Sequence, residues 1–393
     1  MAQPDVVVAG AGVIGAACAE ALSAAGLRVV VLDRGAPASG TTAAGEGNVL
    51  VSDKVPGPEL ELAKASRALW PELLAGLRVE LGDELAGVEW DPKGGLVVAT
   101  AEAAAGPLRE FAAAQRQSGV DAVELSPVEA RALEPLLTKG ITAAVHYPED
   151  AQLQPVLAAT TLLAAVRARG GEVRSGHTVL GVTTNAGGAV SGVRTSQGVV
   201  SCAAVVNACG PWAGEFAAAA GAPINVLPRR GLVLVTAPLP ESVRHKVYDA
   251  DYVGATVSGD ADLQTSTVVE STRAGTVLIG SSRERVGFDE TVRVDVLAEL
   301  AGKAIGLFPF LADVPVMRAY GGFRPYAPDH LPVIGEDPRL PGLWHATGHE
   351  GAGIGLAAAT GRLLADLHQG RKSFVDAEPF RVDRPAVTGE VPA

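Results

Sequence analysis

Cysteines and basic residues are few in this sequence. Its 393 residues contain three cysteines, Cys18, Cys202 and Cys209, which form neither a CxxC pair nor a cysteine–histidine cluster with metal spacing. A sparse, odd set of thiols argues against a disulfide framework and indicates a reducing compartment. The 32 lysines and arginines are outnumbered by 44 acidic residues, which gives a net charge of −12, whereas nucleic-acid phosphates need basic patches. We therefore expect no metal site and no nucleic-acid partner.

Long hydrophobic runs are also missing. No stretch of about 18 apolar residues is free of charge, so we expect no transmembrane segment. The apolar segment at residues 5–32 follows no positively charged stretch and ends in no small-residue cleavage site, unlike a signal peptide. We expect a cytoplasmic protein. Its 48% of apolar residues suffice for the core of one large domain or of two intimate ones.

A glycine motif lies between two expected strands near the N-terminus. Residues 5–9 (DVVVA) and 28–32 (RVVVL) are short, β-branched and typical of buried strands. Between them a small-residue helix ending at Gly26 opens on Gly10, Gly12, Val13, Ile14 and Gly15. Glycines in this GxGxxG pattern allow a tight turn and a close approach to a pyrophosphate, and Asp33 after the second strand can bind ribose hydroxyls. The pattern predicts a dinucleotide site without distinguishing NAD from FAD.

A small-residue loop follows Asp33, where an NAD domain would resume its strand–helix alternation. Residues 34–48 read RGAPASGTTAAGEGN, and Pro37 with four glycines makes a helix or strand unfavourable. Such a loop can lie along a flat ligand and offer hydroxyl and backbone groups to it. The cofactor contacts that we expect from this loop are Arg34, Thr41, Thr42, Gly45, Glu46 and Gly47.

Two further glycine-rich segments lie near the C-terminus. Residues 318–335 read RAYGGFRPYAPDHLPVIG, and residues 343–362 read LWHATGHEGAGIGLAAATGR. The second segment predicts a strand, a glycine turn and an alanine-rich helix. The N-terminus of such a helix is a positive dipole end that can stabilise negative charge on a ligand.

With these motifs, residues 5 to about 370 resemble the D-amino-acid oxidase, glycine oxidase and sarcosine oxidase superfamily of flavoproteins. The spellings GTTAAGEGN and GHEGAGIG look closer to bacterial D-amino-acid or hydroxyproline dehydrogenase-like members than to glycine oxidase. The resemblance implies an α/β (α+β two-domain) architecture, with a Rossmann-like FAD-binding domain and a discontinuous β-rich substrate-binding domain. Some relatives attach the flavin to a C-terminal cysteine, but none follows Cys209, so we expect non-covalent FAD.

The same resemblance implies roles for individual residues. Arg324, in Gly-Phe-Arg-Pro, matches the arginine that binds the substrate carboxylate, and a planar guanidinium suits that task. His349 either contacts the ring or caps the turn, while Glu46 and Glu350 either face the substrate or pair with a local arginine. Glu270 likewise either faces the substrate or pairs with a local arginine. Relatives often add a tyrosine to the site that binds the substrate carboxylate, and the candidates here are Tyr252, Tyr248 and Tyr326. Further cofactor contacts are expected at Gly210, Gly348, Gly351, Ala352, Gly353 and Ile354.

The chain is expected to cross between two domains four times. We assign residues 1–85, 148–221 and 319–375 to the FAD-binding domain, 86–147 and 222–318 to the substrate-binding domain, and 376–393 to a tail. Between the motifs we expect helices over 58–70 (ended or kinked at Pro71), 107–117, 126–134 and 154–169, and a hairpin over 86–100 that turns at Gly94-Gly95.

The implied reaction is oxidation of the C–N bond of a small amino acid or secondary amine, with hydride transfer to flavin N5 and release of an imine. It needs no dedicated base if the site favours the neutral amine. Two alternatives remain: an enzyme that oxidises a 2-hydroxy acid on the same scaffold, and a non-catalytic FAD-holding subunit of a larger complex. The electron acceptor is oxygen, a quinone, or an acceptor protein or partner subunit.

Overall fold

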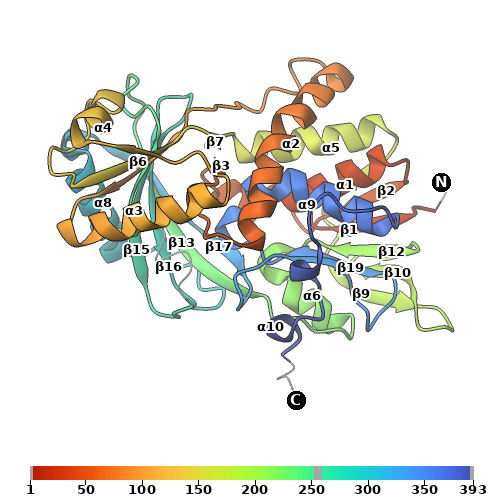
Figure 1. The fold of residues 1–393 in the computed structure, drawn as a ribbon. Coiled ribbons are helices and arrows are strands. Elements are labelled where there is room, and N and C mark those ends of the chain that lie inside the picture. The colour runs from red at the N-terminus through yellow and green to blue at the C-terminus, as the bar shows by residue number, and fades with distance from the viewer. Residues whose placement is uncertain (1–2, 252–258, 390–393) are drawn as a thin grey trace.

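Two sheets lie side by side in the computed structural model, which describes residues 3–251 and 259–389 (Figure 1). The first sheet has six strands, and all neighbours are parallel except the first pair. In spatial order they are β18 (Val333–Glu336), β19 (Leu343–Thr347), β12 (Ala204–Asn207), β1 (Val6–Ala9), β2 (Val29–Leu32) and β8 (Glu172–Arg174). A parallel sheet of this kind is covered on both faces.

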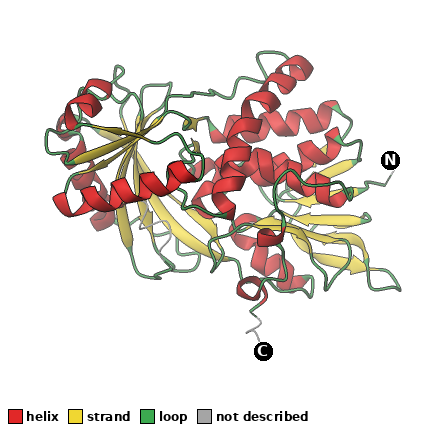
Figure 2. Ribbon diagram, viewed as in Figure 1, coloured by secondary structure: helices red, strands yellow, loops and turns green. Residues whose placement is uncertain are grey.

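Helices cover one face of the first sheet and a second layer of strands covers the other (Figure 2). The covering helices are α1 (Val13–Ala24), α2 (Pro58–Leu81), α5 (Pro155–Ala168) and α9 (Gly353–His368). The opposite layer holds β9 (Val179–Thr184), β10 (Val190–Thr195), β11 (Gly198–Ser201) and α6 (Ala213–Ala219). Strand β1 has apolar side chains for both layers. Val6 and Val8 pack into the helical core, whereas Val7 packs into a second apolar cluster that contains residues of β10. Alternating side chains point to opposite faces of a strand.

The second sheet has eight strands of mixed direction. In order they are β17 (Val316–Tyr326), β13 (Leu227–Thr236), β16 (Val277–Arg283), β15 (Gln264–Ser271), β14 (Lys246–Asp249), β4 (Gly95–Ala99), β6 (Ala143–Tyr147) and β5 (Val123–Leu125). Helices α3 (Glu102–Gln117), α4 (Pro127–Leu133) and α8 (Val294–Leu307) accompany it. Smaller elements are the strand pair β3 (Asn48–Val49) and β7 (Ala151–Gln152), and helix α10 (Pro385–Thr388).

Several expectations for local structure are confirmed. The N-terminal strand–turn–helix–strand unit and the helix near 154–169 form at the expected places. Helix α4 begins with a capping box, in which Ser126 accepts from the Glu129 amide and Glu129 accepts from the Ser126 amide. Residues 34–48 hold only a short 3₁₀ turn at Thr41–Ala44 and the start of β3.

The expected hairpin is wrong, and so is an end of the helix at Pro71, the first of the two alternatives given for that residue. Residues 86–100 form no hairpin, because β4 pairs antiparallel with β6 and parallel with β14. The Gly94-Gly95 pair lies at the start of β4. Helix α2 continues through Pro71 to Leu81, and Pro71 itself is exposed. Here the packing of α2 on the core outweighs the loss of one backbone hydrogen bond at proline.

The expected domain boundary at residue 319 falls inside a strand. Strand β17 pairs along its length with β13 and therefore belongs to the second sheet up to Tyr326. We still propose a division into a cofactor unit and a substrate unit. In this division the chain returns to the cofactor unit after the end of β17 and not at residue 319. None of the helices in the described part of the chain has the length and apolarity that a membrane crossing requires.

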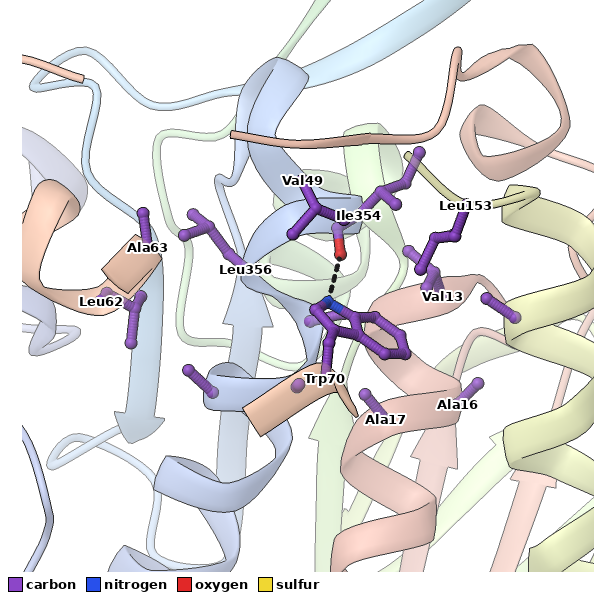
Figure 3. Close-up of a cluster of buried hydrophobic side chains, with 14 of the residues drawn as sticks. Val13, Ala16, Ala17, Val49, Leu62, Ala63, Trp70, Leu153, Ile354 and Leu356 are labelled. Carbon is purple, nitrogen blue, oxygen red and sulfur yellow. Dashed lines mark hydrogen bonds between the residues drawn. The ribbon is translucent and has the colours of Figure 1, made fainter. Parts of the chain in front are cut away.

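Trp70 fixes the position where helix α9 begins (Figure 3). Its side chain is fully buried among Val13, Ala17 and neighbouring apolar side chains. Its indole nitrogen donates to the carbonyl oxygens of Ile354 and Gly355, at 3.3 and 3.2 Å. Helix α2 thus holds the first turn of α9 against α1.

We predict that Trp70→Ala lowers the free energy of unfolding by about 3–5 kcal/mol, because it removes a large buried side chain and leaves a cavity. Chemical denaturation followed by far-ultraviolet circular dichroism measures this loss. Val79→Ala is the matched control on the same helix, since Val79 is 91% exposed, and it should change stability by less than about 0.5 kcal/mol. Equal stability of the two variants would contradict the anchoring role of Trp70.

Candidate active site

The N-terminal glycine turn packs tightly on strand β12. Gly10 has φ +109, and a Cβ there would lie 2.3 Å from the carbonyl oxygen of Ala208. A Cβ on Gly15 would lie 1.9 Å from the carbonyl oxygen of Gly10. Neither position has room for a larger residue, so the start of α1 is held close to the ends of β1 and β12. Gly12, by contrast, borders open space, with only the Thr42 hydroxyl 3.2 Å from a Cβ built there.

Asp33 orders the same turn from the end of β2. Its Oδ2 accepts a hydrogen bond from the Ala11 amide at 2.7 Å, and its Oδ1 accepts one from the Gly35 amide at 2.8 Å. Each carboxylate oxygen has a second lone pair, so both can still accept from a ligand hydroxyl. The Thr42 hydroxyl accepts from the Val13 amide at 3.0 Å and joins the loop to the N-terminus of α1.

A cavity of about 1030 Å³ runs from this turn to the second sheet. The predicted cofactor residues that line it are Gly10, Gly12, Val13, Ile14, Asp33, Arg34, Thr41, Thr42, Gly45, Glu46, Gly210, Gly351, Gly353 and Ile354. Arg324, His349 and Glu350 line it too. The structure therefore brings the N-terminal loop, the turn after β12 and both C-terminal motifs to one cavity.

Arg324 lies over the second sheet within this cavity. A Cβ on Gly231 of the neighbouring strand β13 would lie 2.2 Å from its Nη1, so the absence of a side chain at Gly231 makes room for the guanidinium. Nη1 donates to the carbonyl oxygen of Ser282 at 2.9 Å. A Cβ on Gly351 would lie 3.6 Å from its Nε. The guanidinium is therefore placed between strand β13 and the C-terminal glycine turn.

Glu350 pairs with a local arginine, one of the two roles considered for it. Its Oε1 lies 2.5 Å from Nη1 of buried Arg229, and its Oε2 lies 3.1 Å from Nδ1 of His330. Burial alone would raise the pKa of Glu350, but the hydrogen bond with His330 and the charges of Arg229 and Arg283 outweigh burial and hold that pKa below its ordinary value. Glu350 is therefore a carboxylate, and its φ of +47 is uncommon outside glycine.

His349 is buried and neutral. Its Nε2 lies 2.9 Å from the Thr360 hydroxyl, and no described residue provides a hydrogen-bond partner for Nδ1. Burial lowers the pKa of the imidazole to about 3. It precedes the 3₁₀ turn Glu350–Ala352 and the start of α9 at Gly353. The positive end of the α9 dipole thus lies at the cavity wall.

Some predicted residues lie elsewhere. Gly15, Gly47, Gly348 and Ala352 do not line the main cavity. Gly47 has a packing reason, since a Cβ there would lie 1.9 Å from the Leu153 carbonyl oxygen. Glu270 lies behind the cavity wall and is fully buried. Tyr252 lies outside the described residues.

Tyr320 is the tyrosine that sequence reasoning missed. It lines the cavity, whereas Tyr248 and Tyr326 do not. Tyr248 is buried and donates its hydroxyl hydrogen to Ser52. Tyr320 and Arg324 are four positions apart on one strand, so their side chains share a face. That spacing was a usable signal in the sequence.

Aromatic side chains were missed as well. Trp212, in the Gly-Pro-Trp turn, lies beneath the Arg34 guanidinium, whose central carbon is 3.8 Å from the ring centroid. Its other aromatic contact is Phe288 of the second unit, stacked at 5.1 Å and 4°. No local sequence pattern links residues so far apart. Among the described residues, no three histidine, cysteine or acidic side chains gather in a way that would hold a metal ion.

These residues fit a flavin dinucleotide. The cavity is large enough for a ligand bigger than an ordinary small molecule. Around the N-terminal glycine turn it offers the N-terminus of helix α1 and an acid for ribose, which suits a pyrophosphate and a nucleoside. The N-terminus of α9 and the Arg324 guanidinium line the same cavity, where a reactive ring and an acidic substrate can meet.

Comparison with known proteins agrees with this geometry. The family model described as FAD dependent oxidoreductase matches residues 5–367. The glycine oxidase of Geobacillus kaustophilus is 31% identical over 97% of both chains. The hydrogen cyanide synthase subunit HcnC of Pseudomonas aeruginosa is 30% identical over 97% of this chain and 96% of its own. The crystal structure of glycine oxidase from Geobacillus kaustophilus superposes with a TM-score of 0.88 at 27% identity, over 98% of this chain and 99% of that one.

We predict that Asp33→Ala weakens FAD binding by roughly tenfold to a hundredfold, because it removes a charged acceptor from ribose and from the Ala11 and Gly35 amides. Titration of the apoprotein with FAD, followed by flavin fluorescence, measures the dissociation constant. Asp83→Ala is the control, because the Asp83 side chain is 89% exposed and outside the cavity. An unchanged affinity of Asp33→Ala for FAD would show that Asp33 does not bind the ribose.

Proposed function

We propose, from the premise that this chain belongs to the FAD-dependent oxidoreductase family, that it oxidises the C–N bond of a small amino acid or secondary amine to an imine. The observation that carries this proposal is the single cavity that joins the dinucleotide turn to Arg324. A cofactor bound at one end and a carboxylate bound at the other would meet within it. The relatives named glycine oxidase support a small amino acid as the substrate.

The chain's own residues supply binding, orientation and electrostatics. FAD, when bound, takes up the hydride that leaves the carbon next to nitrogen. Arg324 would hold the substrate carboxylate through two parallel hydrogen bonds, which fixes the adjacent carbon. The N-terminus of α9 would stabilise negative charge that develops next to it. Tyr320 lies on the same strand face as Arg324, and we assign it to the same carboxylate.

We assign FAD binding to the predicted residues that line the cavity, and give Gly15, Gly47, Gly348 and Ala352 the role of shaping the turns around it. His349 would present a neutral imidazole to the ring system. Glu350 would act through its pair with Arg229, which holds the C-terminal glycine turn on strand β13.

The electron acceptor is a separate question. The relative HcnC is named as a subunit of a synthase, which supports an acceptor protein or partner subunit as an alternative to oxygen. We place the protein in the cytoplasm, in line with its sparse thiols. Mixing the substrate-reduced protein with air-saturated buffer separates these acceptors, since an oxidase regains its oxidised spectrum at once and a dehydrogenase does so slowly.

Anaerobic reduction tests the proposed reaction. Amino acids, N-methyl amino acids and 2-hydroxy acids are added in turn to the FAD-loaded protein, and the absorbance of oxidised flavin is followed. We expect at least one amino acid or secondary amine to bleach it. Bleaching by 2-hydroxy acids alone would favour oxidation of a C–O bond. A protein that binds FAD and is bleached by no compound of the panel would favour the non-catalytic subunit.

We predict that Arg324→Leu raises the half-saturating concentration of a carboxylate substrate about a hundredfold while FAD stays bound, because leucine cannot pair with a carboxylate. Rates of anaerobic flavin reduction measured against substrate concentration give this value. Arg109→Leu, on the exposed face of α3, should behave like the parent. Unaltered half-saturation in Arg324→Leu would show that another group binds the carboxylate.

A further inference from the structure

A buried cluster of charges lies against the cavity wall beside Arg324. Glu46 lines the cavity, and its side chain is 10% exposed. Lys246, on strand β14, lies 3.7 Å from Oε2 of Glu46 and 3.6 Å from Oε2 of Glu270. Asn48 completes the cluster, because its amide donates to Glu46 at 3.1 Å and its oxygen accepts from Lys246.

This cluster holds more carboxyl groups than ammonium groups. Two carboxylates share the single ammonium group of Lys246, and Lys93, which also acts on Glu270, lies 3.6 Å from Asp91. Burial raises the pKa of Glu270 to about 7 despite the nearby Lys246. A cation that joins the cluster at Glu46 would favour the ionised form of both carboxyl groups.

The carboxylates also have unused hydrogen-bonding capacity. Oε1 of Glu46 and both carboxylate oxygens of Glu270 are buried, and no described residue donates a hydrogen bond to them. Glu270 is fully buried, so its contact with any ligand is indirect and passes through Lys246 and Glu46. Glu46 is the member of the cluster that a ligand in the cavity can touch.

Glu46 and Arg324 meet the same short stretch of strand β16. A Cβ on Gly280 would lie 2.3 Å from Oε1 of Glu46, and the Ser282 carbonyl accepts from Arg324. An anionic and a cationic group that meet neighbouring residues of one strand, and that line the same cavity, suit a ligand that carries an amino group and a carboxylate on one carbon, as an α-amino acid does.

We propose that Glu46, held by Asn48 and Lys246 and backed by Glu270, binds the amino group of an α-amino acid whose carboxylate is bound by Arg324. This inference rests on the proposed function and deepens it. Glu46 touches the substrate, whereas Lys246 and Glu270 position Glu46. A 2-hydroxy acid binds less well, because its neutral hydroxyl offers no positive charge to Glu46. A carboxylate acceptor also forms stronger hydrogen bonds with a charged donor than with a neutral one.

Calorimetric binding to the FAD-loaded protein tests this assignment. The flavin is chemically reduced beforehand without oxygen, so that the amino acid binds without being oxidised. The probes are the amino acid that bleaches the flavin fastest and the 2-hydroxy acid of the same carbon skeleton, for example glycine with glycolate or alanine with lactate. We expect the parent protein to bind the amino acid at least tenfold more tightly than the hydroxy acid.

Glu46→Gln keeps the size of the side chain and removes its charge. It should weaken amino-acid binding at least tenfold and change hydroxy-acid binding less than twofold. Glu72→Gln, the same change on the exposed face of α2, should retain the preference of the parent. A preference that survives in Glu46→Gln overturns the assignment, as does a parent protein that binds both probes equally.

If Glu46→Gln fails to fold or to hold FAD, a parent protein that binds both probes equally still overturns the assignment. Failure of the proposed function looks different, because then no amino acid bleaches the flavin of the parent. If an amino acid does bleach it and Glu46→Gln binds that amino acid as tightly as the parent does, the proposed function stands and only the role of Glu46 is lost.

Discussion

Close packing of helix α1 on helix α9 is the constraint on which the cavity depends. A Cβ on Gly361 of α9 would lie 2.4 Å from the carbonyl oxygen of Ala17 in α1, so a larger residue would force the helices apart. Each helix begins at a glycine turn that borders the cavity. Contact between the two helices therefore brings together turns that are more than 300 residues apart in sequence, and Trp70 holds the second helix from the other side.

Charges along the cavity are arranged by the same packing. Arg324 lies over Gly231, and Glu350 pairs with buried Arg229 and forms a hydrogen bond with His330. Glu46 and Glu270 both lie near the ammonium group of Lys246. Since like charges buried together are unfavourable, this part of the cavity suits a ligand that carries both signs.

The sequence predicted those parts of the site that are local in the chain. The strand–glycine–helix–acid unit spans about thirty residues, and its backbone requirements can be recognised from the glycines alone. Strand partners cannot be recognised in this way: Gly94-Gly95 suggested a hairpin, yet β4 pairs with β6 and β14, which are distant in sequence. Pairs such as Trp212 with Phe288, or Glu46 with Lys246, depend on how the two sheets meet.

Flavin content tests the central claim most directly. The claim is that the two glycine turns form one site for non-covalent FAD. The purified protein is saturated with FAD, freed of excess by gel filtration, and its visible spectrum is recorded before and after denaturation. The account predicts a yellow protein with close to one FAD per chain, all of it released into the supernatant when the chain is denatured. A folded protein that stays colourless in excess FAD would contradict it.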